Sequence, residues 1–70
     1  MSSKIFIRIK DKNTNIVSNE ISIEDLIYNQ NEIEFRFAEN KSNYSTLPYD
    51  DFLYYQDEYE VIIRIDEKMI

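Results

Sequence analysis

The chain contains one short pattern three times, an arginine between two apolar residues, at intervals of 28 residues. The copies are Ile7-Arg8-Ile9, Phe35-Arg36-Phe37 and Ile63-Arg64-Ile65. Each lies in a segment where apolar and polar residues alternate, which is typical of a half-buried β-strand. The last segment, Tyr59 to Ile65, is rich in β-branched residues, and Ile62 makes its second face apolar as well. We therefore expect this strand at the centre of one sheet.

Two short helical segments complete the repeat. Ser22 to Asp25 is similar to a capping box, with Asp25 in place of the usual glutamate at the third helical position. Pro48 suits the start of a second helix because its missing N–H has no partner to lose there. Both helices carry apolar residues at the same spacing, namely Ile23, Leu26 and Ile27 in the first and Tyr49, Phe52 and Leu53 in the second.

The strand and helix patterns predict an α+β domain of order ββαββαβ over residues 1–70, with short helices on one face of a mixed sheet. The expected strands are Lys4 to Lys10, Ile16 to Ile21 (weaker, at a sheet edge), Ile33 to Phe37, Tyr44 to Leu47 and Tyr59 to Ile65. The chain has no glycine, so asparagine and aspartate must supply any positive-φ turn positions. The predicted core consists of Ile7, Ile9, Leu26, Phe35, Phe52, Val61 and Ile63, with Arg8, Arg36 and Arg64 outside it.

Several segments resemble the ubiquitin-like β-grasp family. Lys4-Ile5-Phe6-Ile7-Arg8 looks like its opening strand, and Phe35-Arg36-Phe37-Ala38 is similar to its third strand. Thr46-Leu47 and Glu60 to Ile65 look like its closing segment, although the segment matching the main helix is shorter here. The resemblance implies a small β-grasp domain that binds proteins. The chain ends without the diglycine that conjugation requires, so we expect it not to be attached to other proteins.

The residue types present restrict the possible chemistry. Without histidine or cysteine, the chain lacks the usual nucleophile–base pairs and transition-metal ligand sets. Without glycine, it lacks phosphate-cradling loops. Adjacent acids such as Asp50 and Asp51 at a helix start are usually partners of the helix dipole. We therefore expect no enzymatic activity, no cofactor and no metal site.

The net charge is −6, with acidic residues gathered in residues 20–39 and 49–70 and basic ones in residues 1–19. An acidic surface repels nucleic acid and membranes and attracts basic protein surfaces. We expect Arg8, Arg36 and Arg64 to lie in neighbouring strands and to pair with Glu34 and Glu60 instead of binding phosphate. The first residues do not resemble a signal peptide, so a cytoplasmic location is expected. The abundance of isoleucine, asparagine, lysine and tyrosine suits an AT-rich genome, such as that of a low-GC bacterium or its phage.

One acidic and aromatic cluster is the best candidate for a binding site. Its predicted partner-binding residues are Asp50, Asp51, Tyr54, Tyr55, Asp57, Glu58 and Glu60. Tyrosines are enriched at protein interfaces, and spaced carboxylates can imitate phosphates before a basic groove. An earlier copy of the cluster consists of Glu24, Asp25, Tyr28, Glu32 and Glu34. The alternative is that Tyr49 and Tyr59 belong to the core and that the acids form a solvated rim.

The leading functional hypothesis is a non-catalytic acidic module that occludes a basic site on a nucleic-acid-handling protein, as small phage-encoded inhibitors and DNA mimics do. The alternative hypothesis is a non-conjugated ubiquitin-like adaptor in a bacterial protein assembly. The expected partner is a protein with a basic surface, and direct binding to nucleic acid or membrane is not expected. A homodimer is a further candidate, because a chain this short buries only ~60% of its unfolded surface.

Overall fold

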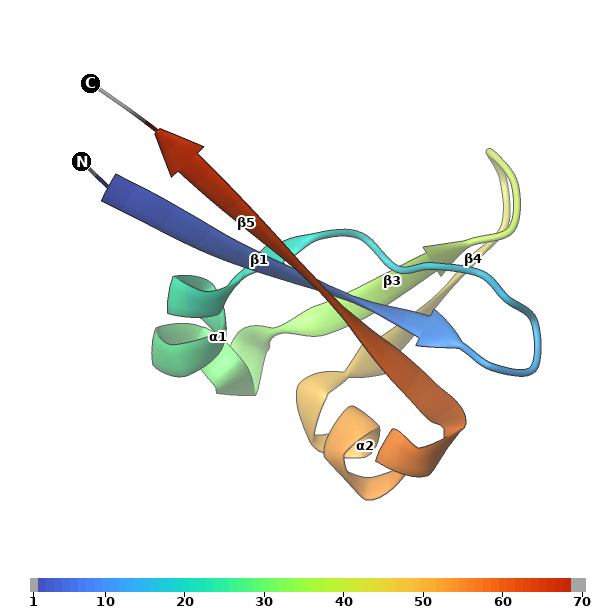
Figure 1. The fold of residues 1–70 in the computed structure, drawn as a ribbon. Coiled ribbons are helices and arrows are strands. Elements are labelled where there is room, and N and C mark those ends of the chain that lie inside the picture. Colours follow the sequence, from blue (N-terminus) through green and yellow to red (C-terminus); the bar gives the residue numbers. More distant parts are fainter. Residues whose placement is uncertain (1, 69–70) are drawn as a thin grey trace.

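The computed structural model describes residues 2–68 of the chain. This part of the chain forms five strands and two short helices, each helix followed by a single 3-10 turn. Figure 1 shows how they are arranged. The strands are β1 (Ser2–Asp11), β2 (Ile21–Ser22), β3 (Glu34–Ala38), β4 (Tyr44–Pro48) and β5 (Tyr59–Lys68). The helices are α1 (Ile23–Asn29) and α2 (Tyr49–Tyr54), and the 3-10 turns are η1 (Gln30–Glu32) and η2 (Gln56–Glu58). The predicted α+β class and ββαββαβ order are confirmed.

The strands form two antiparallel sheets, one of order β2-β1-β5 and one containing β3 and β4. The prediction of one mixed sheet is therefore wrong for residues 2–68, and a β-grasp arrangement is not confirmed. The central position predicted for β5 is also wrong, because β5 pairs only with β1 in the described chain. The central strand is β1, where Ile7 lies opposite Ile63 on one side and Ile21 on the other.

The predicted second strand is shorter than expected because its backbone groups bond to two different sheets. Val17 forms an isolated bridge with Lys10, and the Ser18 N–H donates to the Ile9 carbonyl at 2.8 Å. The next residue turns towards β3, where the Asn19 N–H donates to the Arg36 carbonyl at 3.1 Å. This segment therefore joins the two sheets, and only Ile21–Ser22 forms a regular ladder with β1.

The turns confirm that asparagine and aspartate replace glycine. Asn15 has a φ of 64°, in the left-handed region. The Asp11 carboxylate accepts a hydrogen bond from the Asn13 N–H at 2.8 Å, and the Asn40 side-chain oxygen accepts from the Asn43 N–H at 2.7 Å. These bonds close the loop backbone locally, as Asx-turns do.

The core lies between β1, β3 and α2. Its buried apolar residues are Ile7, Ile9, Ile21, Phe35, Phe37 and Phe52. The ring of Phe52 meets that of Phe35 edge to face, with 5.4 Å between ring centroids. Leu26, a predicted core residue, is partly buried and packs against this cluster. Alternation in β1 and β3 and the helical spacing at Phe52 therefore identified most of the core.

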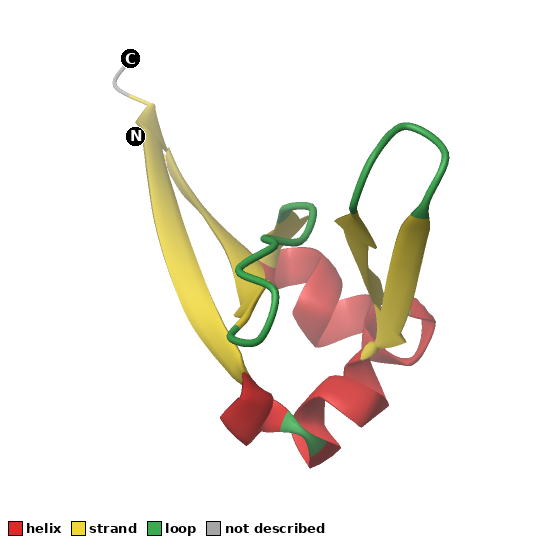
Figure 2. Ribbon diagram, turned by 90° about the vertical axis from the view of Figure 1, so that its right-hand side faces the viewer, coloured by secondary structure: helices red, strands yellow, loops and turns green. Residues whose placement is uncertain are grey.

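Two predicted core residues, Val61 and Ile63, are exposed instead, at 50% and 63%. Their register is the expected one, since they lie opposite the buried Ile9 and Ile7. The cover is missing because the second sheet and the helices pack over β1 and leave most of β5 at the margin. Figure 2 shows the ribbon of β1 and β5 extending beyond the helices towards both termini.

Candidate protein-binding surface

The seven predicted binding residues lie on one corner of the molecule, which we call the acidic corner: Asp50, Asp51, Tyr54, Tyr55, Asp57, Glu58 and Glu60. They belong to α2, η2 and the start of β5, and all seven are exposed. In Figure 1 this corner lies at the end of the molecule away from both termini. The structure therefore brings the predicted residues together and leaves them accessible.

Phe52 fixes the orientation of the acidic corner. It is the buried residue of α2, and its ring packs against Phe35, Tyr49 and Tyr59. Residues four apart share a helix face, so Asp50 and Tyr54 lie together on the side away from Phe52. Burial of one aromatic ring thus determines which residues of this short helix face solvent.

The tyrosines of this region divide into two groups. Tyr54 and Tyr55 are 81% and 48% exposed, and their rings meet edge to face at 4.8 Å. Tyr49 and Tyr59 are partly buried and pack against the core. Burial, followed by the charges of Asp11 and Glu58, raises the pKa of Tyr59 above its ordinary value. The available aromatic surface is therefore that of Tyr54 and Tyr55, as the sequence predicted.

The carboxylates of the corner have little local compensation. Among the described side chains, no cation lies within ion-pair distance of Asp50, Asp51, Asp57 or Glu58. Glu60 lies 3.9 Å from the Lys10 ammonium, and the Lys12 ammonium donates to the backbone carbonyl of Asp57 at 3.0 Å. Asp50 and Asp51 occupy the first turn of α2, where the helix dipole favours a negative charge. The corner is therefore a region of negative potential.

The earlier acidic group lies nearby, on α1, η1 and β3. Tyr28 is 81% exposed, and Asp25, Glu32 and Glu34 line an open depression of about 580 Å³. The two groups are joined where the Tyr49 N–H donates to the Ile33 carbonyl at 3.0 Å. Both copies of the acidic pattern thus face solvent on adjacent elements.

The arginines are arranged differently from the prediction. Arg36 lies in the second sheet, with its guanidinium 4.9 Å from the ring centroid of Tyr44. Arg8 and Arg64 do lie on adjacent strands, but they share Glu20 instead of Glu34 or Glu60. Two neighbouring arginines on one sheet face favour a shared carboxylate, and this preference is the signal that could have indicated Glu20.

Glu20 pairs with both Arg8 and Arg64. Its carboxylate accepts hydrogen bonds from Arg64 at 2.7 and 2.8 Å and from Arg8 at 3.3 Å. The hydrogen bond from Arg64 is the main reason that the pKa of Glu20 falls from 4.5 to about 2. The same contact raises the pKa of Arg64. This cluster ties the loop before β2 to β1 and β5, which gives it a structural role.

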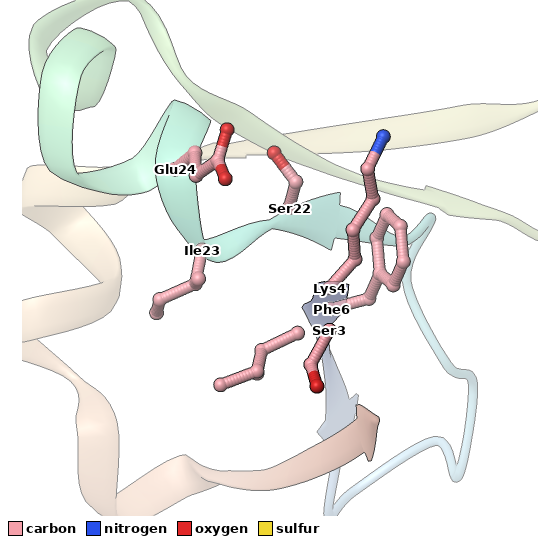
Figure 3. A pocket seen from close by; sticks show the side chains of 7 residues that line it. Ser3, Lys4, Phe6, Ser22, Ile23 and Glu24 are labelled. Atoms are coloured by element: carbon pink, nitrogen blue, oxygen red, sulfur yellow. The ribbon is translucent and has the colours of Figure 1, made fainter. Parts of the chain in front are cut away.

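A hollow at the start of β1 has a volume of about 140 Å³ (Figure 3). It lies between β1 and α1, with the side chain of Ile23 at its wall and the polar ends of Glu24 and Lys4 directed away from it. Small-molecule sites usually measure ~300–1,000 Å³. The hollow is therefore small for a cofactor. In residues 2–68 no group of acidic residues is arranged to hold a metal ion.

In the described chain, neither helix has the length or apolar character needed to cross a membrane. Comparison with protein-family models, curated proteins and solved structures found no match in any of the three searches.

Proposed function

We propose that this protein is a non-catalytic protein-binding module whose acidic corner docks on a basic surface of a nucleic-acid-handling protein. The observation that carries the proposal is the exposure of all seven corner residues, four of whose carboxylates have no described cation within ion-pair distance. Unpaired carboxylates spaced along a helix and a turn can occupy the positions that phosphates would take in a basic groove. In this proposal, the protein inhibits its partner by occluding that groove.

The exposed tyrosine pair supports the same surface. Carboxylates mainly accelerate association and select a basic partner, whereas a ring that loses its water on docking slows dissociation. Tyr54 and Tyr55 lie next to the acids and are held by their contact at 4.8 Å. The acidic corner thus combines carboxylates that accelerate association with two tyrosines that can slow dissociation.

The test uses two variants of equal net charge. In the corner variant, Asp50, Asp51 and Asp57 become Asn and Glu58 becomes Gln. In the matched control, the earlier acidic group is neutralised through Glu24→Gln, Asp25→Asn, Glu32→Gln and Glu34→Gln. Proteins captured from the source cell's lysate by the parent chain are identified, and their affinity for all three forms is measured at low and high salt.

The corner variant should lose at least ~10-fold in affinity at low salt, mainly in association rate, and the control should lose much less. Affinity of the parent should fall as salt rises, because the Debye length shortens from ~10 Å at 0.1 M to ~3 Å at 1 M. Duplex DNA or RNA should displace the module if both occupy one basic groove. Equal losses in the two variants, or no competition by nucleic acid, would overturn the mimic proposal.

Tyr55→Ala should increase the dissociation rate with little change in the association rate. Tyr28→Ala is the matched control, since Tyr28 is an exposed tyrosine of the earlier acidic group. Stopped-flow or surface-based kinetics with the captured partner would separate the two rates. An unchanged dissociation rate for Tyr55→Ala would remove this residue from the interface.

The alternative is a non-conjugated ubiquitin-like adaptor that binds through apolar sheet surface. The exposure of Ile63 and Ile65, at 63% and 59%, favours this second candidate. An adaptor of this kind would bind its partner with little dependence on salt, and neutralisation of the acidic corner would leave its affinity unchanged.

A further inference from the structure

Strand β5 carries apolar residues at positions that are buried in the other two copies of its pattern. At intervals of 28 residues, Ile9 in β1 corresponds to Phe37 in β3 and to Ile65 in β5. The first two are 0% and 6% exposed, whereas Ile65 is 59% exposed. Val61 and Ile63 on the same face are also exposed. The face of β5 that carries Val61, Ile63 and Ile65 is therefore apolar like a core-facing surface, but it is exposed to solvent.

The outer edge of β5 is also open along its backbone. The Lys12 N–H donates to the Glu58 carbonyl at 3.1 Å, which continues the β1–β5 register by one step. Because hydrogen-bonded pairs alternate in an antiparallel ladder, even-numbered residues of β5 direct their backbone groups at β1. The odd-numbered residues, including Val61 and Ile63, direct theirs outward. In residues 2–68 no other strand pairs with that edge.

Proteins usually protect a long edge strand with proline, lysine, a bulge or a covering loop. β5 is ten residues long and contains no proline, and its one lysine, Lys68, is its last residue. Val61, Ile63 and Ile65 lie on the face that adjoins the core, opposite Ile9, Ile7 and Ile5 of β1. The Cα radius of gyration is 13.1 Å, against ~11 Å for a compact chain of this length. The extended ribbon in Figure 2 accounts for this difference.

We propose that a second copy of this chain pairs with β5 in antiparallel orientation about a two-fold axis at Ile62. The two three-stranded sheets would then join into one continuous sheet. In this register Val61 lies opposite Ile63 of the second copy, and their outward backbone groups exchange hydrogen bonds. The proposed interface overlaps the acidic corner at Glu60 and adjoins it at Glu58, which comes opposite Asp66 of the second copy. The proposal does not depend on the proposed function.

The charges within β5 are compatible with this register. A centre at Ile62 sets Glu60 opposite Arg64 of the second copy, twice by symmetry. A centre at Ile63 would set Glu60 opposite Asp66, and a centre at Arg64 would set that arginine opposite itself. Like charges directly opposite each other destabilise a sheet, and opposite charges stabilise it. Within β5, a centre at Ile62 therefore combines a pair of opposite charges with the apolar pair of Val61 and Ile63, and it sets no like charges opposite each other.

The same register explains why a second copy fits the uncovered end of β5. Ile65, which lies beyond the cover of its own chain, comes to lie opposite Tyr59 of the second copy. Tyr59 is partly buried, because its ring stacks on Phe37 at 5.9 Å and packs against Phe52 at 5.9 Å. In the dimer, the partly buried start of β5 in each chain, at Tyr59, thus lies beside the exposed Ile65 of the other chain.

The absence of native cysteine allows a direct test of the register. Ile62→Cys places a thiol opposite its own copy in a non-hydrogen-bonded pair, where the Cα atoms lie ~4.5 Å apart. Ile63→Cys is the matched control, because it lies opposite Val61 and is displaced from its own copy. Under a mild oxidant, Ile62→Cys should form a covalent dimer at least ~10-fold faster than Ile63→Cys. Equal rates would overturn the register.

A second experiment tests the surface itself. Ile63→Lys places a charge on the open face, and Ile27→Lys is the control, since Ile63 and Ile27 are 63% and 60% exposed. Sedimentation velocity over a concentration series should show dimers for the parent and for Ile27→Lys. Ile63→Lys should weaken the dimer by about 100-fold, because two isoleucine contacts are lost and each is worth about tenfold. Circular dichroism would establish that all three forms are folded.

A parent chain that stays monomeric up to ~1 mM, where weak dimers are populated, would overturn the proposal. So would a dimer that Ile63→Lys leaves intact. Neither result would affect the acidic-corner proposal, which is tested by salt dependence and corner neutralisation. A dimer through β5 would occupy the apolar surface that the adaptor alternative requires, and its formation would therefore count against that alternative.

Discussion

Strands β3 and β5 present the same three-residue pattern to opposite surroundings. Phe35 and Phe37 are 0% and 6% exposed, whereas Ile63 and Ile65, at the equivalent positions, are 63% and 59% exposed. β3 is followed by β4 and α2, and Phe52 of α2 packs against it. β5 has no such unit after it in the described chain. Alternation thus defines which face of a strand is apolar, but the elements that follow the strand provide its cover.

The largest expected effect contrasts Phe35→Ala with Ile63→Ala. Phe35 is fully buried, so its truncation leaves a cavity and should cost ~3–5 kcal/mol, enough to unfold most molecules of a domain this small. Ile63→Ala should cost less than ~1 kcal/mol in the monomer, because most of its side chain already contacts water. Thermal melts at low protein concentration would measure both. Similar losses would show that β5 is covered in solution.

The second comparison uses two residues that face each other across one ladder. Ile9 and Val61 are register partners, but Ile9 is 0% exposed and Val61 is 50% exposed. Ile9→Ala should cost ~2–5 kcal/mol, and Val61→Ala should cost under ~1 kcal/mol. Urea unfolding followed by circular dichroism gives the two free energies. A Val61→Ala loss near that of Ile9→Ala would contradict the observed asymmetry.

A smaller loss of stability is expected when the N-terminal cap of α1 is removed. The Ser22 hydroxyl accepts a hydrogen bond from the Asp25 N–H at 3.2 Å and caps α1. Ser22→Ala should cost ~1 kcal/mol, and Ser22→Asp should retain most of the stability because aspartate also caps helices. Comparison of the two midpoints in urea isolates the cap. Equal loss in both variants would indicate that the hydroxyl acts elsewhere.

The smallest expected effect is the pH dependence of the ion pairs that Glu20 forms with Arg8 of β1 and Arg64 of β5. The pKa of Glu20 is about 2 in the folded chain and ordinarily 4.5. A lowered folded-state pKa stabilises the fold above pH 4.5, and this contribution is lost as the pH falls towards 2. Salt should weaken it, because the Glu20 side chain is 20% exposed and its arginine partners are about half exposed.

Glu20→Gln provides the control, since it removes the titrating group and keeps the side-chain shape. The difference in unfolding free energy between the parent and this variant should shrink as the pH falls from 5 towards 2. Denaturation at several pH values would measure it. A constant difference across this window would show that Glu20 contributes no pH-dependent stability.

Local patterns predicted much of the fold and the whole candidate surface. The element order, an asparagine in the left-handed region, the Ser22 cap and the buried Phe35 all follow from local residue types and spacing. The exposure of Tyr54 and Tyr55 follows from their place beyond the apolar face of α2. These features depend on residues a few positions apart, whose geometry the backbone fixes.

Only the tertiary structure decided the order of the strands, the pairing of Glu20 and the exposure of β5. The sequence determined that Val61, Ile63 and Ile65 share one face, because successive side chains of a strand point to opposite sides. Whether that face is buried depends on which distant elements pack over it. The apolar-arginine-apolar pattern is nearly the same in all three strands, so it cannot show which strand lies at the centre of a sheet and which lies at its edge. The segment around Asn19 bonds to β3 as well as β1 and closes one side of the sheet, and β5 is left at the other.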